Sequence, residues 1–401
     1  MSKKRVSLFG YGITTKALAE VIKDPVFYDD NYTEPTFDEN RYLIRPTKEF
    51  NPDFSDLEIT SPGIPPSHQL IQKAKHLISE YDYFADVMTH KIWISGTNGK
   101  TTTTQMMQHI LDDKGAIYGG NIGVPLAKLD QKAPIWILET SSFTIHYTNK
   151  AKPNIYVLLP LTPDHLSWHG SMSAYISDKL KPVKKMSKYA TAIIPYKYRN
   201  VKTSAKLITY KDEEDLASQF NIDISKVKFK GAFLLDALLA MVVDKLLFER
   251  ISYDTINSFK LDPHRQEEIL DSKKRLWVND TKATNIDASI AAIKRYQDKF
   301  IHLILGGDDK GVNLNELFEF IKDKDIKIYT IGSNKDKLIK LANTFGVKHQ
   351  KCKNLEDAIL QIDKELKDDQ VALLSPAAAS LDEFDSYAQR GDLFKQSCQK
   401  F

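Results

Sequence analysis

Short apolar runs that end in glycine-rich or polar turns recur along the chain. In the first half, residues 5–9, 91–95, 135–138 and 154–159 are runs of this kind, and stretches with helical spacing lie between them. Apolar runs of this length are typical of buried strands, whereas apolar residues three or four positions apart indicate helices. Strands that alternate with helices predict an α/β fold built on parallel sheets.

The second half repeats this alternation. We expect strands over Leu276–Asn279, Phe300–Leu305, Lys327–Ile331 and Gln370–Leu374, each followed by a polar turn. In such folds the turns after the strands form the working edge of the sheet. Ahead of these strands, residues 233–247 are apolar on every side, which predicts a buried helix.

Two stretches have weaker patterns. Residues 69–81 have helical spacing, so we predict one amphipathic helix there. Residues 206–229 are rich in Lys, Asp and Glu, so we predict an irregular excursion rather than a regular element.

One turn has the residue types of a phosphate-binding loop. A strand over Lys91–Ser95 leads into the glycine turn Gly96–Gly99, and Lys100 and Thr101 then open a helix. Backbone N–H groups of such a loop and the N-terminus of its helix face an anion. Lys100 would supply a point charge for the phosphates, and the Thr101 hydroxyl a ligand for Mg²⁺. The general pattern has Gly where Ile94 stands, so a glycine turn that caps an ordinary helix is the alternative.

Two further turns at strand ends carry groups that suit phosphate or metal chemistry. Glu139 follows the strand 135–138, where a second Mg²⁺ ligand lies in such folds. His165 and His169 are four positions apart, a spacing that zinc ligands on a helix also show. Position 166 lacks the Glu of that zinc motif, so zinc is an alternative to a His that faces phosphate or Mg²⁺.

Near the N-terminus lies a nucleotide-type turn. Residues 10–15 follow the strand 5–9 as G-x-G-x-x-T, with Thr15 where a dinucleotide fold has its third Gly. Asp29 and Asp30 follow at the distance at which an acidic residue binds a ribose. The turn predicts a Rossmann-like unit with a nucleotide-type ligand, and a turn without any ligand is the alternative.

Composition and length narrow the class of protein. The 401 residues are 42% hydrophobic with a net charge of +3, which is typical of globular proteins and indicates no nucleic-acid partner. Cys352 and Cys398 match no metal spacing and are expected to be free thiols in a reducing compartment. No apolar run approaches the ~18 residues of a membrane helix, so we expect no membrane partner and a cytoplasmic location.

The length predicts two or three domains. We place the boundaries so that residues 1–88, 89–262 and 263–401 each form one domain. The first and third are predicted to be Rossmann-like, and the second to be a P-loop ATPase-type parallel sheet.

Taken together, these turns resemble those of the Mur ligases over nearly the whole chain. The most specific matches are NDTKATN at 279–285 and LSPAAASLDEF at 374–384. The other matching pieces are Ser61–Ile64, Gly96–Thr102, Gly120–Gly123, Glu139 with Ser141–Phe143, Asp164–Leu166, His264–Arg265, Gly306–Gly311 and Gln389–Asp392. The short phosphate loop is also the form that this family uses, which accounts for Ile94.

The resemblance implies an ADP-forming acid–amino-acid ligase. Members bind a UDP-sugar with their N-terminal domain, ATP with the middle domain and an amino acid with the C-terminal domain. The pieces match those members that join D-glutamate to UDP-N-acetylmuramoyl-L-alanine (UDP-MurNAc-L-alanine) for peptidoglycan, with ATP and two Mg²⁺ ions. We therefore expect small-molecule substrates and a monomer.

The same resemblance assigns residues of this sequence to roles. The catalytic residues would be Lys100, His165, Lys179 and Lys282. ATP would be bound by Gly96, Thr97, Asn98, Gly99, Lys100, Thr101, Thr102, Arg265, Asp280 and Lys282. The UDP-substrate would be bound by Thr14, Thr15, Asp29, Asp30, Ser61, Gly63, Asn121 and His165, and D-glutamate by Thr284, Lys310, Ser375 and Phe384. The metal ligands would be Thr101, Glu139, His165 and Lys179, the last as a carbamate formed with CO₂.

The sequence departs from the family's pattern in two places. Ala232 and Phe233 stand where the family usually has a His-Asn pair, and Asp236 replaces an Asn, although Asp236 could still accept a hydrogen bond from the adenine amino group. Asn31 takes the place of an Arg that some relatives stack on uracil. From its residue type alone, Lys179 could equally be a solvated charge on a helix.

Three other classes of protein explain fewer of these motifs. A folylpolyglutamate synthetase-type ligase shares the ATPase core but has no need of the unit at residues 10–22. An NAD-dependent oxidoreductase would leave the loop at Gly96 and the NDTKATN turn unused. A non-catalytic nucleotide-binding protein would keep Lys100 but has no role for Lys282 and Lys310.

Overall fold

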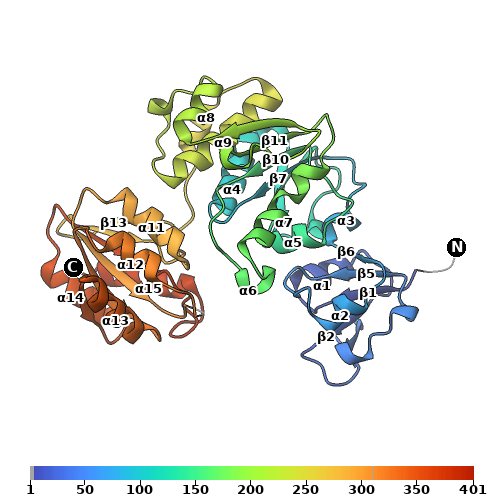
Figure 1. Ribbon diagram of the computed structural model, residues 1–401, viewed down its shortest axis with the longest axis horizontal. Coiled ribbons are helices and arrows are strands. Elements are labelled where there is room, and N and C mark those ends of the chain that lie inside the picture. Colours follow the sequence, from blue (N-terminus) through green and yellow to red (C-terminus); the bar gives the residue numbers. More distant parts are fainter. Residues whose placement is uncertain (1–3, 310) are drawn as a thin grey trace. The chain divides into compact units, whose positions relative to one another are not determined.

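The computed structural model describes residues 4–309 and 311–401, which form two compact units (Figure 1). The first unit extends to Phe229 and includes Phe233–Phe259, and the second contains Lys230–Ala232 and Lys260–Phe401. Within the described residues, the first unit carries two sheets of strands and the second carries one. The predicted α/β class with mainly parallel sheets is confirmed.

The N-terminal sheet of the first unit is parallel except at one edge. Its strands are β1 (Val6–Phe9), β2 (Val26–Asp29), β3 (Thr36–Phe37), β4 (Leu43–Pro46), β5 (Leu57–Thr60) and β6 (Leu77–Ile78), in the order β3-β4-β2-β1-β5-β6. Only β3 runs antiparallel to its neighbour β4 among the described pairs. The helices are α1 (Ile13–Ala19), α2 (Gln69–Lys73) and α3 (Glu80–Tyr83). The single helix predicted over residues 69–81 is wrong, because Leu77 and Ile78 pair with β5 and separate two short helices.

The central sheet of the first unit is parallel in every described pair. Its strands are β7 (His90–Ser95), β8 (Ala116–Gly120), β9 (Ile135–Glu139), β10 (Ile155–Leu158), β11 (Thr191–Pro195) and β12 (Lys206–Tyr210), in the order β12-β11-β10-β7-β9-β8. The helices are α4 (Lys100–Leu111), α5 (Ser142–Tyr147), α6 (Leu166–His169), α7 (Met172–Lys185), α8 (Glu213–Gln219), α9 (Ala232–Phe248) and α10 (Tyr253–Ser258). The irregular excursion predicted over residues 206–229 is wrong, since β12 and α8 lie there. The predicted buried helix is confirmed, because α9 is buried from Phe233 to Asp244.

One apolar core joins the two sheets of the first unit. Leu8 and Ile59 of the N-terminal sheet and Trp93 and Trp136 of the central sheet belong to the same cluster of buried side chains. Burial of this continuous apolar surface is the main force that holds the two sheets together.

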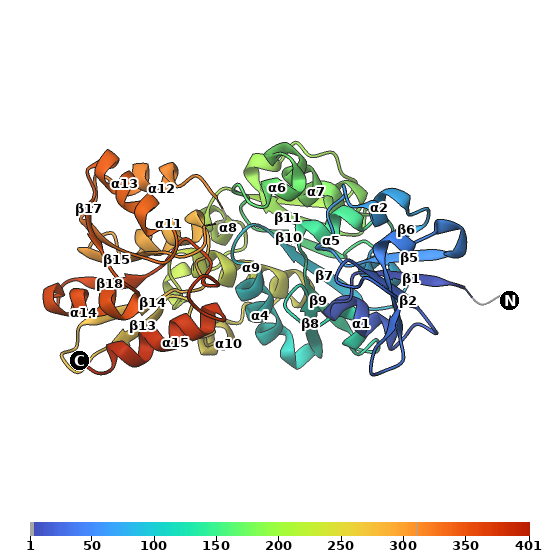
Figure 2. The ribbon, with the colours of Figure 1, turned by 90° about the horizontal axis from the view of Figure 1, so that it is seen from below.

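The sheet of the second unit is parallel apart from its first strand (Figure 2). Its strands are β13 (Glu267–Leu270), β14 (Leu276–Asn279), β15 (Ile301–Gly306), β16 (Ile326–Ile331), β17 (Lys348–Lys351) and β18 (Val371–Leu374), in the order β13-β14-β18-β15-β16-β17. The helices are α11 (Ile286–Arg295), α12 (Asn315–Ile321), α13 (Lys335–Phe345), α14 (Leu355–Glu365) and α15 (Tyr387–Cys398). Two separate apolar clusters pack in this unit, one around Leu303 and the other around Trp277.

None of the helices in the described part of the chain combines the length and the apolar character that crossing a bilayer requires.

Candidate active site

The glycine turn between β7 and α4 is shaped by close approach of the backbone to neighbours. Gly96 has φ of 149° and Gly99 has φ of 84°. A Cβ atom on Gly96 would lie 2.5 Å from Cβ of Leu159, and one on Gly99 would lie 2.6 Å from Oδ1 of Asp236. Only glycine combines this backbone conformation with so little room. The turn therefore holds its N–H groups and the start of α4 in the arrangement that a phosphate requires.

Lys100, the first residue of α4, folds back over this loop. Its Nζ donates to the carbonyl oxygens of Gly96 at 3.1 Å and Thr97 at 2.7 Å. The ammonium group thus lies beside the loop and the positive end of the helix, where an anion would meet both.

Glu139, at the end of β9, connects two other predicted site residues. Thr101 Oγ1 donates to Glu139 Oε2 and Asn121 Nδ2 donates to Oε1, each at 2.8 Å. Glu139 is buried, and a hydroxyl and a carboxylate in contact are the oxygen donors that Mg²⁺ accepts. In the described part of the chain no three His, Cys, Asp or Glu side chains are grouped to hold a metal ion. The donor set therefore fits an ion held jointly by protein oxygens and phosphate.

Lys179 lies in the interior, under the same loop. Its side chain is 1% exposed, and its Nζ donates to Ser95 Oγ at 2.9 Å and to Gly96 O at 3.0 Å. Burial, followed by repulsion from Lys100, lowers the pKa of Lys179 well below its usual value. The alternative of a solvated helix charge is excluded, and the position favours an uncharged amine.

The two histidines after β10 have different surroundings. His165 is half exposed, with its Nε2 3.3 Å from Asp164 Oδ2, and its ring packs against Phe143. His169 is buried: its Nδ1 lies 3.0 Å from Asp178 Oδ2 and its Nε2 lies 2.9 Å from Ser142 Oγ. Because His169 is bound within the protein, the two rings do not converge as zinc ligands.

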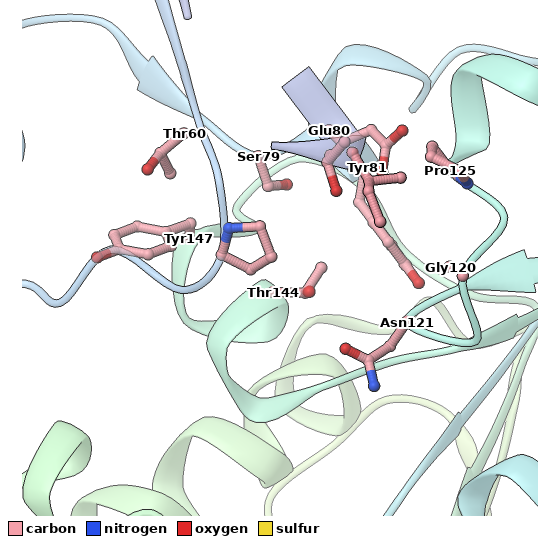
Figure 3. A pocket seen from close by; sticks show the side chains of 13 residues that line it. Thr60, Ser79, Glu80, Tyr81, Gly120, Asn121, Pro125, Thr144 and Tyr147 are labelled. Atoms are coloured by element: carbon pink, nitrogen blue, oxygen red, sulfur yellow. The ribbon is translucent and has the colours of Figure 1, made fainter. Parts of the chain in front are cut away.

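A cavity of about 160 Å³ within the first unit brings two predicted substrate residues together (Figure 3). Thr14 comes from the start of α1 and Asn121 from the turn after β8. Figure 3 shows the side chains of Tyr81, Thr144 and Asn121 around this space. The lining of this cavity therefore mixes hydroxyl, amide and carboxyl side chains with apolar ones.

A second, more open cavity of about 350 Å³ lies at the carboxyl ends of β1, β2 and β5. Four predicted substrate residues line it, namely Asp29, Asp30, Ser61 and Gly63. The hydroxyl of Thr15 is buried and donates to the Gly10 carbonyl at 2.6 Å, so it stabilises the turn itself. We therefore expect Thr15 to contact the UDP-substrate through its backbone and not through its hydroxyl.

In the second unit, Asp280 lies at the end of β14 and is buried. Ser375 Oγ donates to Asp280 Oδ2 at 2.8 Å, and the backbone N–H of Gln266 donates to Oδ1 at 3.2 Å. Burial raises the pKa of Asp280 to about 7. Since the Ser375 hydroxyl is fully buried in this contact, the prediction that it binds D-glutamate is narrowed to the backbone of Ser375.

Of the other predicted residues of the second unit, Lys282, Thr284 and Phe384 lie after strands, whereas Arg265 precedes β13. Lys282 Nζ lies 3.3 Å from Tyr387 Oη and over the Tyr387 ring, Thr284 is exposed, and Phe384 packs on the core around Trp277. Nε of Arg265 is buried and finds no hydrogen-bond partner among the described residues, so it has a donor to offer a ligand. Lys310 lies outside the described residues.

Sequence reasoning did not predict the supporting role of two side chains. Arg390 is buried and donates to Thr281 Oγ1 and to the carbonyls of Thr281 and Ala378, at 2.8, 3.0 and 3.1 Å, so it ties the NDTKATN turn to the turn after β18. Asp236 is buried and accepts from Thr103 Oγ1 at 2.8 Å beside Gly99. It supports the loop, and the suggested adenine contact stays a prediction. The QRG motif was a signal for Arg390, whereas only the fold brings Asp236 to α4.

Comparison with known proteins agrees with this geometry. Residues 94–236, which contain the phosphate loop, Glu139 and Lys179, match the Mur ligase middle domain. The crystal structure of MurF ligase from Thermotoga maritima in complex with ADP has a TM-score of 0.61 to this chain, covering 99% of this chain and 98% of that one. At 16% sequence identity this likeness shows the fold alone.

Two relatives match over almost their entire length. A UDP-N-acetylmuramoylalanine--D-glutamate ligase of Campylobacter jejuni (strain RM1221) is 53% identical, with 99% of this chain and 100% of the relative covered. One of Helicobacter pylori (strain HPAG1) is 45% identical, with 98% of each chain covered. The chain therefore belongs to the Mur ligases, and it is an ATP-dependent ligase. Within that family its high-identity relatives are the ligases that carry the name UDP-N-acetylmuramoylalanine--D-glutamate ligase.

Proposed function

We propose that the chain joins D-glutamate to UDP-N-acetylmuramoyl-L-alanine in peptidoglycan synthesis, with the residues described above. The observation that carries this proposal is the convergence of Lys100, Thr101, Glu139 and Lys179 around one phosphate loop. That arrangement suits transfer of a phosphoryl group to a carboxylate, and the identity of the relatives supports the choice of substrates.

The proposed reaction has two steps. The carboxylate of the UDP-substrate is a poor electrophile, so it first attacks the γ-phosphorus of ATP, forming an acyl phosphate and releasing ADP. The amine of D-glutamate then attacks the acyl carbon, an amide bond forms, and phosphate leaves with loss of one proton from nitrogen. Catalysis rests on positioning and on cations that face the charge on phosphate. Lys100, assisted by the N-terminus of α4, has this role in the first unit.

Mg²⁺ supplies further positive charge to the phosphates when it is bound. We assign Thr101 and Glu139 as its protein ligands, with His165 and Lys179 near a second ion. Lys179 would react as an uncharged amine with CO₂: its nitrogen bonds to carbon, and one proton is lost. The resulting carbamate is an anion, which replaces the repulsion between Lys100 and Lys179 by attraction.

The second unit would bind the remaining groups. We assign Arg265, Asp280 and Lys282 to ATP, and Thr284, Phe384, Lys310 and the backbone of Ser375 to D-glutamate. The three-domain division at residues 88 and 262, a monomeric state and a cytoplasmic location, where ATP is available, are parts of the same proposal.

The test is phosphate release from ATP in the presence of UDP-MurNAc-L-alanine and a panel of amino acids. We expect release with D-glutamate and at least a hundredfold less with L-lysine or D-alanyl-D-alanine. Equal rates with L-lysine would overturn the assignment of the amino acid. No release with any amino acid, by a folded protein, would overturn the assignment of the reaction.

A further inference from the structure

The open cavity of the N-terminal sheet contains an ion pair that the proposed mechanism does not use. Asp30 follows β2, and its Oδ2 lies 2.9 Å from Nε2 of His68, which precedes α2. Both residues line the cavity, together with Ser61 and Gly63. The His68 side chain is 18% exposed and that of Asp30 is 64% exposed, so the histidine is the fixed member of the pair.

The orientation of the His68 ring is set by the backbone. The N–H of Leu70 donates to Nδ1 of His68 at 3.2 Å. Because a backbone N–H can only donate, Nδ1 is the acceptor and the proton of the neutral ring is on Nε2. Nε2–H therefore points at Asp30 in the neutral ring.

The other carboxylate oxygen of Asp30 is fixed in the same way. Thr47 Oγ1 donates to Asp30 Oδ1 at 2.8 Å, while Gln69 Nε2 donates to Thr47 Oγ1 at 2.9 Å. The Thr47 hydroxyl oxygen thus accepts one hydrogen bond, and its O–H donates another to Asp30. The hydrogen bond from Thr47, followed by that from His68, lowers the pKa of Asp30, so Asp30 is a carboxylate that only accepts hydrogen bonds.

We propose that His68 is a positioning residue that holds the Asp30 carboxylate as the acceptor for the N–H and O–H donors of the nucleoside part of the substrate. This inference rests on the proposed binding of a UDP-substrate in the cavity. A carboxylate repels phosphate, so the diphosphate lies at the Ser61–Gly63 end and the nucleoside at the Asp30 end. The donors that fit are the ribose hydroxyls or the imide N–H of uracil.

Two substitutions at one position separate this role from simple helix capping. Asparagine is a good N-cap and can still accept from the Leu70 N–H, but it is too short to reach Asp30. Glutamine has an amide N–H at about the reach of Nε2. We expect His68→Asn to keep the melting temperature and to raise the KM for UDP-MurNAc-L-alanine about tenfold, the value of one hydrogen bond to a charged group. His68→Gln should restore most of the affinity, and kcat and the KM for ATP should change much less.

The control is His76→Ala, which removes an exposed histidine of the same unit and should change neither KM. Inhibition by UDP, 2′-deoxy-UDP and CDP distinguishes the two donors. If a ribose hydroxyl is the donor to Asp30, inhibition by 2′-deoxy-UDP should be equally strong for the wild type and His68→Asn. If the uracil N–H is the donor, inhibition by CDP should be equally strong for the two proteins.

The outcomes separate this inference from the proposed site. If Asp30→Asn leaves the KM for the UDP-substrate unchanged, the site assignment fails and the inference fails with it. If Asp30→Asn raises this KM but His68→Asn does not, the site stands and the role of His68 is wrong.

Discussion

At the scale of single residues, two lysines compete for one carbonyl oxygen. Nζ of Lys100 and Nζ of Lys179 both lie within hydrogen-bond distance of Gly96 O, at 3.1 and 3.0 Å. Two ammonium groups this close repel each other, and the buried Lys179 is the one whose charge costs more. Burial and the charge of Lys100 therefore both lower the pKa of Lys179.

Replacement of Lys100 by alanine should remove a fixed cation without removing core packing. We expect Lys100→Ala to lower kcat by a factor on the order of 10²–10³, the loss typical of one preorganised charge-stabilising group. Steady-state phosphate release measures this change, and circular dichroism checks the fold. Lys132→Ala removes an exposed lysine of the same unit and should have wild-type turnover. Near-normal turnover by folded Lys100→Ala would argue against the phosphate-loop assignment.

Replacement of Lys179 tests the carbamate. Lys179→Ala should be nearly inactive, because the cavity left under the loop holds no anion. A short carboxylate such as acetate or propionate should restore part of the activity, since it can occupy the place of the carbamate. The measurement is kcat as a function of added carboxylate, with Lys181→Ala, on the same helix, as control. A fully active Lys179→Ala enzyme would remove the residue from the mechanism.

At the scale of elements, hydrogen bonds connect the helices of the site to one another and to a neighbouring strand. Asp178 of α7 binds His146 of α5 and His169 of α6, each at 3.0 Å, so these three helices share one carboxylate. The Tyr156 hydroxyl of β10 also donates to the carbonyl of Lys179 at 2.7 Å. The position of Lys179 is therefore fixed by contacts of the residue before it and of its own carbonyl.

The phosphate loop offers a test of backbone geometry. Gly99→Ala introduces a Cβ 2.6 Å from Oδ1 of Asp236 at positive φ, so either the loop or the buried Asp236 side chain that supports it must shift. We expect the KM for ATP to rise at least tenfold, because the N–H groups leave their positions around the phosphate. The matched control is Gly346→Ala, which also has positive φ but has nothing within 4 Å of the added atom. Gly346→Ala should lower the unfolding free energy only by the backbone strain, about 1–2 kcal/mol. Its KM for ATP should be unchanged.

At the scale of the whole molecule, each unit contains a carboxyl group whose pKa burial raises to about 7. These groups are Glu80 at the start of α3 in the first unit and Asp280 in the second. Glu80 is buried beside the cavity of Figure 3 and accepts from the Ala127 N–H at 3.3 Å. Ionisation of either group in the folded protein therefore opposes folding.

The Glu80 contribution predicts how stability depends on pH. Its pKa rises from 4.5 to about 7 on folding, so the folded state binds more protons than the unfolded state in that window. The unfolding free energy should therefore fall as the pH rises from about 4.5 to 7, by up to about 3 kcal/mol from this group. Urea unfolding at pH 5 and pH 7.5 measures the change. Glu80→Gln should lose the part of this change that Glu80 contributes and keep the part that Asp280 contributes, whereas Glu34→Gln, an exposed control, should keep the whole change. Equal pH dependence in all three proteins would contradict the role of Glu80.

The local patterns of the sequence were enough for the α/β class, the phosphate loop and the turns at strand ends. Gly96–Lys100 could be predicted because glycines, lysine and hydroxyl follow one strand directly, and every part of the motif lies within a few residues. The buried helix α9 could also be predicted from the sequence, since its apolar residues cover every side of the helix.

Tertiary structure decided what depends on partners distant in sequence. Leu77 and Ile78 form a strand because β5 offers them an edge, and residues 206–210 form one because β11 does. No local pattern shows that Lys179 is buried under Gly96, that Ser375 is turned toward Asp280, or that Asp236 supports α4. Spacing along the chain sets which groups can share a helix face or a turn, whereas burial and pKa depend on what packs against them. The sequence by itself therefore determined the kind of chemistry, and the fold decided which lysine lies over the loop and which is buried beneath it with a lowered pKa.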